Sequence, residues 1–506
     1  MKTLRIIFLG LVAGLGTVPI PGFQLFFSLG LSFFLLQGET SPHPVPAMGS
    51  FAFGYFLMAL HWIPCSLHVN WTQYGYLIPF ALLGLPLFFS FYYRVGAWFI
   101  PWYRYRLPFR IFWLALLWAL LDIIRAEFLT GFPWASLGTM WTTCLPISQL
   151  ASLMGPYLLS GITLCWLATP YILLSPLYTK RYKGLYGIFV VVSFIGSFWY
   201  GSHRINHLSR AAVHPPYLRL VQPNFPQGVM MSKKAMREGL DHFVTLSTRP
   251  SDYPLKAVIW PEFDFHLSPE RHGWMMDYIK KACPAAGVLI TNGFRYGNRK
   301  VYNSMMAFDH DGYGITFYDK HRLLPFGEYI PFRHFIDSIL PGQIHKMSGG
   351  LGDFTPGDAP KLLCSKDLPC FMPLICHEAI FSGKFQTKET AQAQWILNLT
   401  NDGWFLHSLE PYQHLAMAQM RAIESGVPVV RVANTGISAV IDPLGQILLQ
   451  LPYGEAQTAD FYLPAPLQEK PFYALVSQAD PYPIICWIIY LLMALKFVLR
   501  RRHVAP

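Results

Sequence analysis

Three side chains in this sequence have the chemistry needed to move an acyl group. Glu262 lies in the segment AVIWPEF, Lys320 in FYDKHRLLPFGEY and Cys376 in PLICHEAIF. A carboxylate can remove the proton of a thiol, the thiolate can attack a carbonyl carbon, and a cation can stabilise the oxyanion that forms. We therefore interpret these residues as a candidate base, cation and nucleophile for acyl transfer through a thioester.

Each of the three residues also has an ordinary structural explanation when it is considered alone. Glu262 could cap a helix or face solvent, Lys320 could be a solvated lysine, and a single cysteine is more often a buried core residue than a nucleophile. The neighbouring residues favour the functional interpretation. KAVIW is typical of a buried strand, so the carboxyl group of Glu262 would lie at a buried edge, where desolvation raises its pKa. Lys320 lies between two apolar runs, Phe317-Tyr318 and Leu323-Leu324-Pro325-Phe326-Gly327.

The elements that must position these residues form an α/β pattern from Tyr217 onward. Three polar signatures, Pro261-Glu262, Cys376-His377-Glu378 and Asn401-Asp402, each follow directly after a strand-like run. Because ligands gather at the carboxyl ends of strands in α/β sheets, we expect these residues to converge on one crevice. Strands are predicted in YLRLVQPN, KAVIW, GVLITNG, SMMAF, FMPLI, WILNLT, PVVRVAN and ISAVID, and helices over 230–247, 269–283 and 411–425.

The composition divides the chain into two unlike parts. The 506 residues are 53% hydrophobic, 16% aromatic and only 13% charged. Residues 1–202 are nearly continuous apolar sequence, whereas 217–470 is mixed. A bilayer core of about 30 Å requires about 20 apolar residues per helix. Candidate spans lie near 5–20, 22–38, 50–68, 76–93, 109–127, 150–174, 185–202 and 483–499. The first two could instead form one kinked helix.

The positions of the basic residues decide between these alternatives. With two separate first spans and the N-terminus inside, strict alternation places the basic clusters within 94–110, 180–183 and 500–502 on the cytoplasmic side. We therefore predict seven spans over 1–202, a domain over 203–482 that faces away from the cytoplasm, and a last span with a basic cytoplasmic tail over 483–506. A cleavable signal peptide is not expected. The clusters explain the net charge of +11, so nucleic acid is not an expected partner.

The cysteines and histidines do not have the spacing of a metal site. The eight cysteines include no CxxC pair, and His321, His377 and His414 lack the pattern of zinc ligands. No metal or other cofactor is therefore expected. Cys364 and Cys370 are close enough in sequence to form a disulfide if the domain faces an oxidising compartment.

Two aromatic and charged segments have both a structural and a functional interpretation. Arg125 and Trp134 fall at an outward-facing membrane edge, where they either anchor the interface or help to hold a lipid headgroup or dock the domain. Trp404 and Phe405 follow a strand, where they either gate an acyl chain or belong to the core.

Taken as an ordered set, the motifs resemble the nitrilase superfamily, which uses a Glu–Lys–Cys triad on an αββα sandwich. More closely, the chain is similar to the apolipoprotein N-acyltransferase family, the membrane-embedded branch of that superfamily. The expected fold is therefore a multi-span α-helical membrane domain plus an α/β nitrilase-like αββα sandwich domain. The motifs that carry the resemblance are Trp260-Pro261-Glu262, Tyr302-Asn303-Ser304, Lys320 with Pro325-Phe326-Gly327-Glu328-Tyr329-Ile330-Pro331, Ile375-Cys376-His377-Glu378, Asn401-Asp402-Gly403-Trp404-Phe405, Gln413-His414, Met420-Arg421-Ala422-Ile423-Glu424, and Ala433-Asn434-Thr435-Gly436-Ile437-Ser438.

The resemblance implies a two-step reaction. The sulfur of Cys376 would take a fatty acyl chain from a phospholipid, and the α-amine of the S-diacylglyceryl cysteine of an apolipoprotein would then take it from the thioester. The implied location is the bacterial inner membrane, with the catalytic domain on the periplasmic side. By the same resemblance Glu328, Glu378, His377 and Asn303 support the triad. The candidates for contact with the lipid or the acceptor are Asn401, Trp404, Phe405, Arg421, Arg125 and Trp134.

Two positions depart from the family's pattern. His377 stands where a tyrosine is usual, and Met231 stands where a tryptophan is expected. Both changes concern how the lipid or the acceptor is held, and neither touches the triad. Two other functions compete with acyl transfer: a membrane-tethered nitrilase-type hydrolase of a soluble amide or nitrile, and a transporter or receptor whose outer domain only binds. Spans at both ends argue against the first, and a binding module does not require the Glu/Lys/Cys set.

Overall fold

The structure, a computed structural model, consists of two compact units. The helical unit contains Met1–Pro64, Tyr74–Leu208 and Pro471–Pro506, and the sandwich unit contains Cys65–Gln73 and Ser209–Lys470. The residues that the structure describes are 2–38, 43–69, 71–99, 110–208, 215–225, 227, 233–263, 268, 272–297, 299–339, 346 and 352–478.

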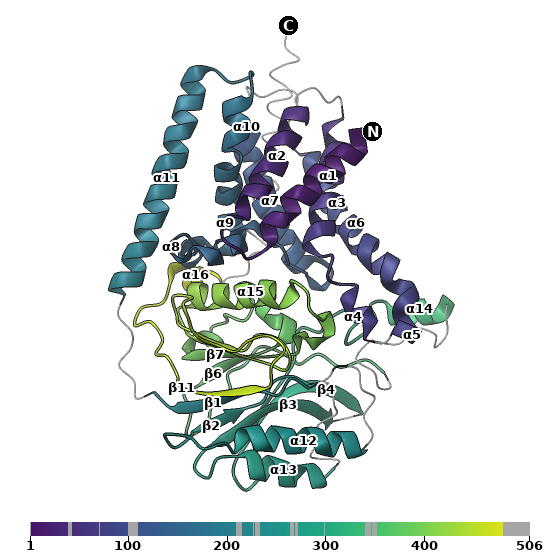
Figure 1. Ribbon diagram of the computed structural model, residues 1–506, viewed down its shortest axis with the longest axis vertical. Coiled ribbons are helices and arrows are strands. Elements are labelled where there is room, and N and C mark those ends of the chain that lie inside the picture. Colours follow the sequence, from purple (N-terminus) through teal and green to yellow (C-terminus); the bar gives the residue numbers. More distant parts are fainter. Residues whose placement is uncertain are drawn as a thin grey trace. The chain divides into compact units, whose positions relative to one another are not determined.

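The helical unit contains a helix in each of the seven segments predicted as spans between residues 5 and 202 (Figure 1). Within the described residues, Gly75–Ala97, Ala151–Leu174 and Lys180–His207 are long and apolar enough to cross a membrane, and Gln24–Gly38 and Pro44–Ala59 are shorter apolar helices. The span predicted at 483–499 lies outside the described residues. The helices are α1 (Lys2–Gly14), η1 (Leu15–Thr17), α2 (Gln24–Gly38), α3 (Pro44–Ala59), η2 (Gly75–Leu77), α6 (Ile78–Ala97), α7 (Arg110–Glu127), η4 (Phe128–Thr130), η5 (Leu137–Thr143), α8 (Leu145–Ser148), α9 (Ala151–Leu167), α10 (Thr169–Leu174), α11 (Lys180–His207) and α16 (Phe472–Val476).

Glycines bring the first three helices into close contact. A Cβ atom at Gly10 of α1 would lie 2.1 Å from a backbone oxygen of α3, and one at Gly30 of α2 would lie 2.5 Å from a backbone oxygen of α1. Small residues allow helix backbones to approach in this way inside membranes. Because α1 and α2 pack side by side, the alternative of one long kinked helix is wrong.

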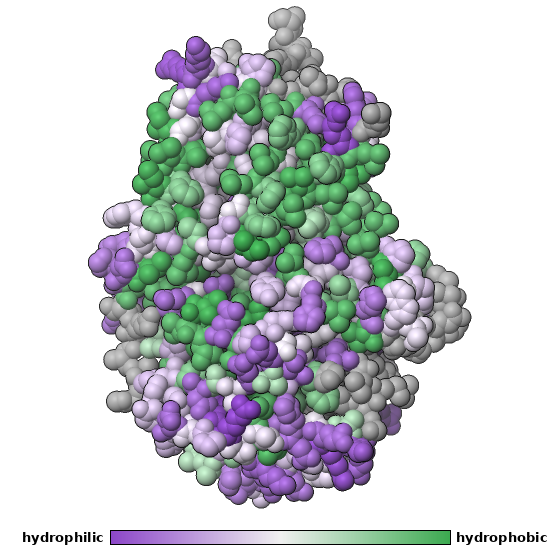
Figure 2. All heavy atoms as spheres, viewed as in Figure 1, coloured by the Kyte–Doolittle hydropathy of each residue, from purple (hydrophilic) through white to green (hydrophobic). Residues whose placement is uncertain are grey.

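Large apolar side chains cover the exposed faces of the helical unit. Figure 2 shows hydrophobic residues over its helices, whereas the surface of the sandwich unit is more hydrophilic. Exposed apolar patches of this kind mark surfaces that contact a partner or a bilayer, and on long apolar helices the bilayer is the natural contact. Examples are Phe80, Leu87 and Phe91 on α6 and Ile188, Val192 and Trp199 on α11.

Helix α3 (Pro44–Ala59) differs in position from the predicted segment 50–68. It begins at Pro44, where the fixed φ of proline suits the first turn, and its C-cap is Leu60, whose φ is −119°. Pro64 disfavours helical geometry at the residue before it. The short helices α4 (Cys65–His68) and α5 (Trp71–Tyr74) follow in the segment that leads to α6.

Two sheets form the centre of the sandwich unit. The strands of the six-stranded sheet are, in order, β11 (Gln457–Tyr462), β1 (Tyr217–Gln222), β2 (Ala257–Ile259), β3 (Val288–Gly297), β4 (Lys300–Phe308) and β5 (Gly314–Asp319). Those of the five-stranded sheet are β10 (Ile447–Gln450), β9 (Ala439–Ile441), β8 (Val429–Ala433), β7 (Trp395–Thr400) and β6 (Phe371–Ile375). The central strands β1–β3 and β6–β8 are parallel.

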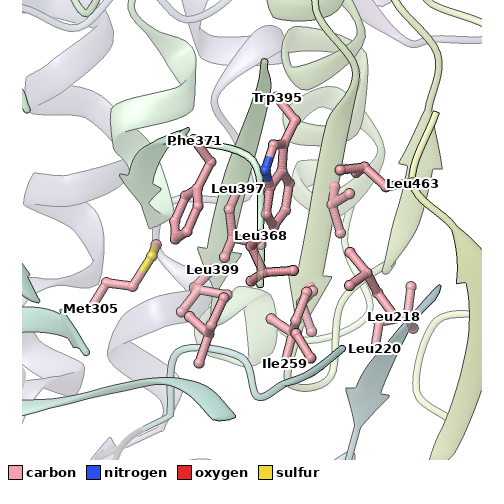
Figure 3. Close-up of a cluster of buried hydrophobic side chains, with 14 of the residues drawn as sticks. Leu218, Leu220, Ile259, Met305, Leu368, Phe371, Trp395, Leu397, Leu399 and Leu463 are labelled. Carbon is pink, nitrogen blue, oxygen red and sulfur yellow. The ribbon is translucent and has the colours of Figure 1, made fainter. Parts of the chain in front are cut away.

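Alternate residues of both sheets meet in one buried core. In Figure 3, Leu218, Leu220 and Ile259 of the six-stranded sheet face Trp395 and Leu399 of the five-stranded sheet. This period of two is what a strand requires when it buries one face against another sheet. The core therefore fixes the register of the two sheets on each other.

Helices cover the outer faces of both sheets, which completes an αββα sandwich (Figure 1). On the six-stranded sheet, Phe243 of α12 (Lys233–Ser247) and Ile279 of α13 (Trp274–Ala282) pack against Val258 and Leu289. The five-stranded sheet is covered by α15 (Glu410–Ser425), which packs on β8. The described part of the unit also contains α4, α14 (Arg333–Ile339), η6 (Cys376–Ile380), η7 (Thr390–Gln392) and η8 (Asp402–Phe405).

All eight predicted strands are confirmed, and three strands were not predicted. These are β5, β10 and β11, whose residues are mostly half-exposed or exposed. Of the predicted helices, 411–425 corresponds to α15, whereas 230–247 and 269–283 correspond to the shorter α12 and α13. Residues 230–232 and 269–271, and with them Met231, lie outside the described residues.

A disulfide joins Cys364 and Cys370 just before β6. Leu363 and Phe371 pair as an antiparallel bridge beside it. The question that the sequence left open is therefore answered: the two cysteines close a short loop that leads into the strand ending at Cys376.

Candidate active site

The ends of three strands bring Glu262, Lys320 and Cys376 together. Glu262 follows β2 and Lys320 follows β5 of the six-stranded sheet, whereas Cys376 follows β6 of the five-stranded sheet. The carboxyl group of Glu262 interacts with the thiol of Cys376 and raises its pKa, and Nζ of Lys320 lies 3.8 Å from Oε1 of Glu262. The site is thus assembled from both sheets.

The backbone at Cys376 has an uncommon conformation. Its φ is +51°, in the left-handed region that residues with a side chain rarely adopt. Cys376 begins η6 directly after β6, so the chain turns sharply at this residue. Strained backbone of this kind persists where the surrounding structure holds it, and it clusters at functional sites.

Two carboxylates share the ammonium of Lys320 and the amide of Asn303. Nζ of Lys320 donates to Oε1 of Glu328 at 3.0 Å, and Nδ2 of Asn303 donates to Oε1 of Glu262 at 3.0 Å and to Oε1 of Glu328 at 2.7 Å. The orientation of the Asn303 amide is fixed because its oxygen accepts from Nδ2 of Asn292 at 2.6 Å. The backbone N–H of Leu324 holds the second oxygen of Glu328 at 2.7 Å.

Burial and these charges decide which groups carry protons. Burial raises the pKa of the Glu262 carboxyl, and the nearby ammonium of Lys320 opposes that rise. Burial works against the charge of Lys320, but the carboxylates of Glu328 and Glu262 outweigh it and raise its pKa, so Lys320 remains a cation. Burial and the charge of Glu262 raise the pKa of the Cys376 thiol well above its usual value. The sulfur is therefore protonated in this environment.

Glu378 ties the turn at Cys376 to the segment after Lys320. Its Oε2 accepts from the N–H of Ile375 at 2.8 Å. Its Oε1 accepts from the hydroxyl of Tyr318 at 2.8 Å and from the N–H groups of His321 at 2.9 Å and Arg322 at 3.0 Å. Burial raises the pKa of Glu378 to about 7. One buried carboxyl group thus holds the strand ends of both sheets.

His377, next to the candidate nucleophile, is a neutral buried ring. It packs edge-on against Phe381 with ring centroids 5.8 Å apart. Its Nδ1 is buried and has no hydrogen-bond partner among the described residues. Burial, and then the charge of Lys320, lower its pKa well below the usual value. The His377 ring is therefore part of the packed interior next to Cys376.

Asn401 and Arg421 hold backbone near the site. Oδ1 of Asn401 accepts from the N–H of Gly403 at 3.2 Å at the start of η8. Arg421 donates to the carbonyl oxygen of Ala379 in η6 at 3.0 Å and to Glu424 at 3.1 Å. Both side chains are buried, so their contacts position the loops. Trp404 and Phe405 lie on η8 and are partly exposed.

Arg125 and Trp134 are buried within the helical unit. Nη2 of Arg125 donates to Oδ1 of Asp122 at 2.6 Å, and Nη1 donates to the carbonyl oxygen of Trp134 at 2.9 Å. The guanidinium also lies 4.9 Å from the ring centroid of Phe56. These contacts favour the structural one of the two interpretations that the sequence left open.

Sequence analysis did not identify a buried charged group beside the site, which we call the Asp402 cluster: Asp402, Glu410, His414 and Arg431. Oδ2 of Asp402 lies 2.6 Å from Nη2 of Arg431, and Nδ1 of His414 lies 3.2 Å from both Asp402 and Glu410. The spacing of Glu410 and His414, one helical turn apart, is the signal that could have indicated it.

The Asp402 cluster also has the geometry of a metal site. Ligand atoms of Asp402, Glu410 and His414 lie within 4.8 Å of one another. However, the guanidinium of Arg431 already contacts Asp402, and its Nη2 lies 3.2 Å from Nδ1 of His414. A metal ion bound there would repel this fixed positive charge. We therefore interpret the group as an ion-pair cluster.

Comparison with known proteins identifies the class of both units. Residues 211–464 match the family model described as carbon-nitrogen hydrolase, so the sandwich unit is a nitrilase-like domain. Residues 9–169 match the model described as apolipoprotein N-acyltransferase N-terminal domain.

Full-length relatives agree with both matches. The apolipoprotein N-acyltransferase of Rhodopseudomonas palustris is 33% identical over 93% of this chain and 91% of that protein. That of Bradyrhizobium diazoefficiens is 33% identical over 90% of this chain and 86% of that protein. Among solved structures, an amidase from Nesterenkonia sp. is 16% identical, with a TM-score of 0.35, over 55% of this chain and 98% of the amidase. The chain belongs to the apolipoprotein N-acyltransferase family, and it is an N-acyltransferase.

Proposed function

We propose that this protein transfers a fatty acyl chain from a membrane phospholipid, through a thioester on Cys376, to the α-amine of the S-diacylglyceryl cysteine of apolipoproteins. The observation that carries the proposal is that Glu262, Cys376 and the buried cation of Lys320 meet in one site: Lys320 lies 3.8 Å from Glu262, and both charges act on the thiol of Cys376. The two relatives described above have names that state the same acceptor and the same transfer.

In the first half-reaction, Glu262 accepts the proton of Cys376 as the sulfur attacks the ester carbonyl of the phospholipid. The charge that develops on the carbonyl oxygen is stabilised by Lys320 and by the backbone N–H of His377, and each such donor contributes about 3 kcal/mol in comparable sites. Collapse of the tetrahedral intermediate breaks the ester bond. Glu262 then returns its proton to the leaving alkoxide, which departs as the lysophospholipid.

In the second half-reaction, the α-amine of the acceptor attacks the thioester. An amide bond forms, the C–S bond breaks, and Glu262 relays one proton of the amine to the sulfur. Donor and acceptor react at the same thiol in turn, so the kinetics are expected to be ping-pong. Water must be kept from the thioester between the two steps, which the apolar surroundings of a lipid-facing site would favour.

We further propose the arrangement predicted from the sequence: a seven-span domain over 1–202, a catalytic domain over 203–482 outside the cytoplasm, and a last span with a basic tail over 483–506. The inner membrane is the proposed location, and the phospholipid, the apolipoprotein and the bilayer are the proposed partners. The disulfide between Cys364 and Cys370 supports this orientation, because such bonds persist in oxidising compartments.

The test is mass spectrometry of the purified full chain after incubation with phospholipid vesicles. We expect a fatty-acyl adduct on the peptide that contains Cys376, and its loss when a peptide with an S-diacylglyceryl N-terminal cysteine is added. Cys376→Ser should abolish the adduct, whereas Cys283→Ser, at a buried cysteine of the same unit, should retain it. Turnover of soluble amides without any acyl adduct would support the competing hydrolase instead. Binding of a ligand that is unaffected by Cys376→Ser would support the receptor.

A further inference from the structure

Thr400 places one hydroxyl group between the sulfur of Cys376 and the Asp402 cluster. Its Oγ1 lies 3.5 Å from Sγ of Cys376 and 3.0 Å from Oδ1 of Asp402. Both atoms can accept a hydrogen bond, but a threonine hydroxyl has a single proton to donate. The hydroxyl can therefore donate to only one of the two, the carboxylate or the sulfur, at a time.

The carboxylate does not depend on Thr400 for its hydrogen bonds. Oδ2 of Asp402 accepts from Nη2 of Arg431 at 2.6 Å. Oδ1 lies 3.2 Å from Nδ1 of His414, a nitrogen that also faces Glu410 and Nη2 of Arg431. If the hydroxyl of Thr400 turns away, Asp402 therefore keeps its ion pair with Arg431.

A second line of hydrogen bonds connects the same cluster to the backbone of Cys376. Nη1 of Arg431 donates to Oδ1 of Asn398 at 2.7 Å, and Nδ2 of Asn398 donates to the carbonyl oxygen of Cys376 at 3.2 Å. Thr400 and Asn398 both lie on β7. The strand next to β6 thus holds the sulfur and the carbonyl of the same residue, and the Asp402 cluster supports both contacts.

We propose that Thr400 is a further catalytic residue, which donates its hydroxyl proton as a hydrogen bond to the Cys376 thiolate, and that Asp402 is a positioning residue that holds this hydroxyl while the sulfur is protonated. The inference rests on the proposed function. During attack the S–H bond breaks and an O–H bond forms on Glu262. Thr400 keeps its proton throughout and only rotates about its Cβ–Oγ1 bond, which moves its hydrogen bond from Oδ1 of Asp402 to the sulfur.

The charges around the sulfur favour such a donor. The carboxylates of Glu262 and Asp402 both oppose a negative sulfur, and Lys320 favours it. The other titratable groups that interact electrostatically with Asp402 are Arg431, His414, Glu410 and Tyr453. A neutral donor at 3.5 Å stabilises the thiolate without adding a charge to this crowded network.

The test compares Thr400→Val, which removes the hydroxyl and keeps the shape, with Thr400→Ser, which keeps the hydroxyl. The full chain in detergent is treated with iodoacetamide over a range of pH, and alkylation is quantified on the Cys376 peptide. Acylation by phospholipid is measured in parallel. In Thr400→Val we expect alkylation to shift to higher pH and acylation to slow about 10- to 100-fold, as for a lost hydrogen bond to a charged group. Thr400→Ser should remain close to the parent chain. An unchanged alkylation profile in Thr400→Val, or an equal loss in Thr400→Ser, would overturn the proposal.

Asp402→Asn should shift the pH dependence of alkylation in the direction opposite to Thr400→Val. It removes a negative charge that raises the pKa of the thiol and releases the hydroxyl of Thr400, so alkylation should move to lower pH. Structural damage alone would not shift the two variants in opposite directions. If Asp402→Asn does not fold, the two Thr400 variants decide the outcome. Alkylation needs no phospholipid, so a parent chain that alkylates normally but forms no acyl adduct refutes the proposed function separately.

Discussion

Replacement of Lys320 by methionine tests the electrostatic reasoning about the site most directly. The change keeps most of the side-chain volume and removes the only charge that faces both Glu262 and Glu328 within the described residues. Two effects on the first half-reaction are expected. The oxyanion loses one donor, which costs about 10²- to 10³-fold in comparable sites. The Glu262 carboxylate loses an attraction that, at 3.8 Å and an effective dielectric constant of about 20, is at most about 4 kcal/mol.

The second effect has a sign that can be measured. Lys320 lowers the pKa of Glu262 against the effect of burial, so its removal raises that pKa and leaves less carboxylate to act as a base at any given pH. In Lys320→Met, single-turnover acylation of Cys376 should fall at least about 100-fold, and the acid limb of its pH profile should move to higher pH. The assay is acid quenching followed by mass spectrometry of the Cys376 peptide.

A second variant separates this mechanism from simple damage. Glu328 raises the pKa of Glu262, so Lys320→Met combined with Glu328→Gln should move the acid limb back towards lower pH, although the oxyanion donor is still missing. The reasoning is refuted if Lys320→Met acylates within about 10-fold of the parent chain, or if the double variant leaves the pH profile of Lys320→Met unchanged.

Three further predictions concern stability. Replacing Cys364 and Cys370 by serine should lower the free energy of unfolding by about 2 kcal/mol, as expected for a short disulfide loop. Denaturation of the parent chain with and without reductant measures the same difference, and equal free energies of unfolding would contradict the prediction. Gly10→Val should prevent folding of the helical unit, because its Cβ would lie 2.1 Å from a backbone oxygen. Gly84→Val, where a Cβ meets nothing within 4 Å, should fold. The yield of monodisperse protein distinguishes the two variants, and equal yields would show that the close approach of the helices at Gly10 is unimportant. Burial raises the pKa of Glu378 from 4.5 to about 7. The unfolded chain therefore loses this proton at lower pH than the folded chain does, and the free energy of unfolding should fall by about 3 kcal/mol as pH rises from 4.5 to 7. Glu378→Gln should flatten the plot of melting temperature against pH in that range, and an equally steep plot would argue against the assignment.

The convergence of the strand ends could be predicted from the sequence because it depends on local patterns. Buried runs such as KAVIW and FMPLI lead to Glu262 and Cys376, and within each sheet the carboxyl ends of the parallel strands meet at one edge. That the edges of the two sheets lie together follows only from the packing of the sheets on each other. Lys320 was harder to place. The strand that precedes it, β5, is exposed or half-exposed along most of its length, so it lacks the apolar run that identifies a central strand. The edge strands β10 and β11 were missed for the same reason.

The Asp402 cluster was not predicted as a whole, because its members come from three elements and only the Glu410–His414 spacing is a local signal. Asp402 lies on η8, Glu410 and His414 on α15, and Arg431 on β8. Each is a polar residue in an ordinary sequence context, and only tertiary packing shows that all four are buried together. In the helical unit, each of the seven predicted segments contains a helix, but the position of α3 depended on where its prolines allow a helix to begin and end.

The division of the site between two sheets has a consequence for how mutations far from the chemistry would act. The base and the ammonium belong to one β-layer and the thiol to the other, so their alignment depends on the hydrophobic contacts between the layers. A truncation such as Leu399→Ala would leave a void at that junction, and a small relative slip of the layers would lengthen the proton-transfer distance. Turnover would then decline in variants that still fold, and enzymatic rate would report on core packing with more sensitivity than melting temperature does.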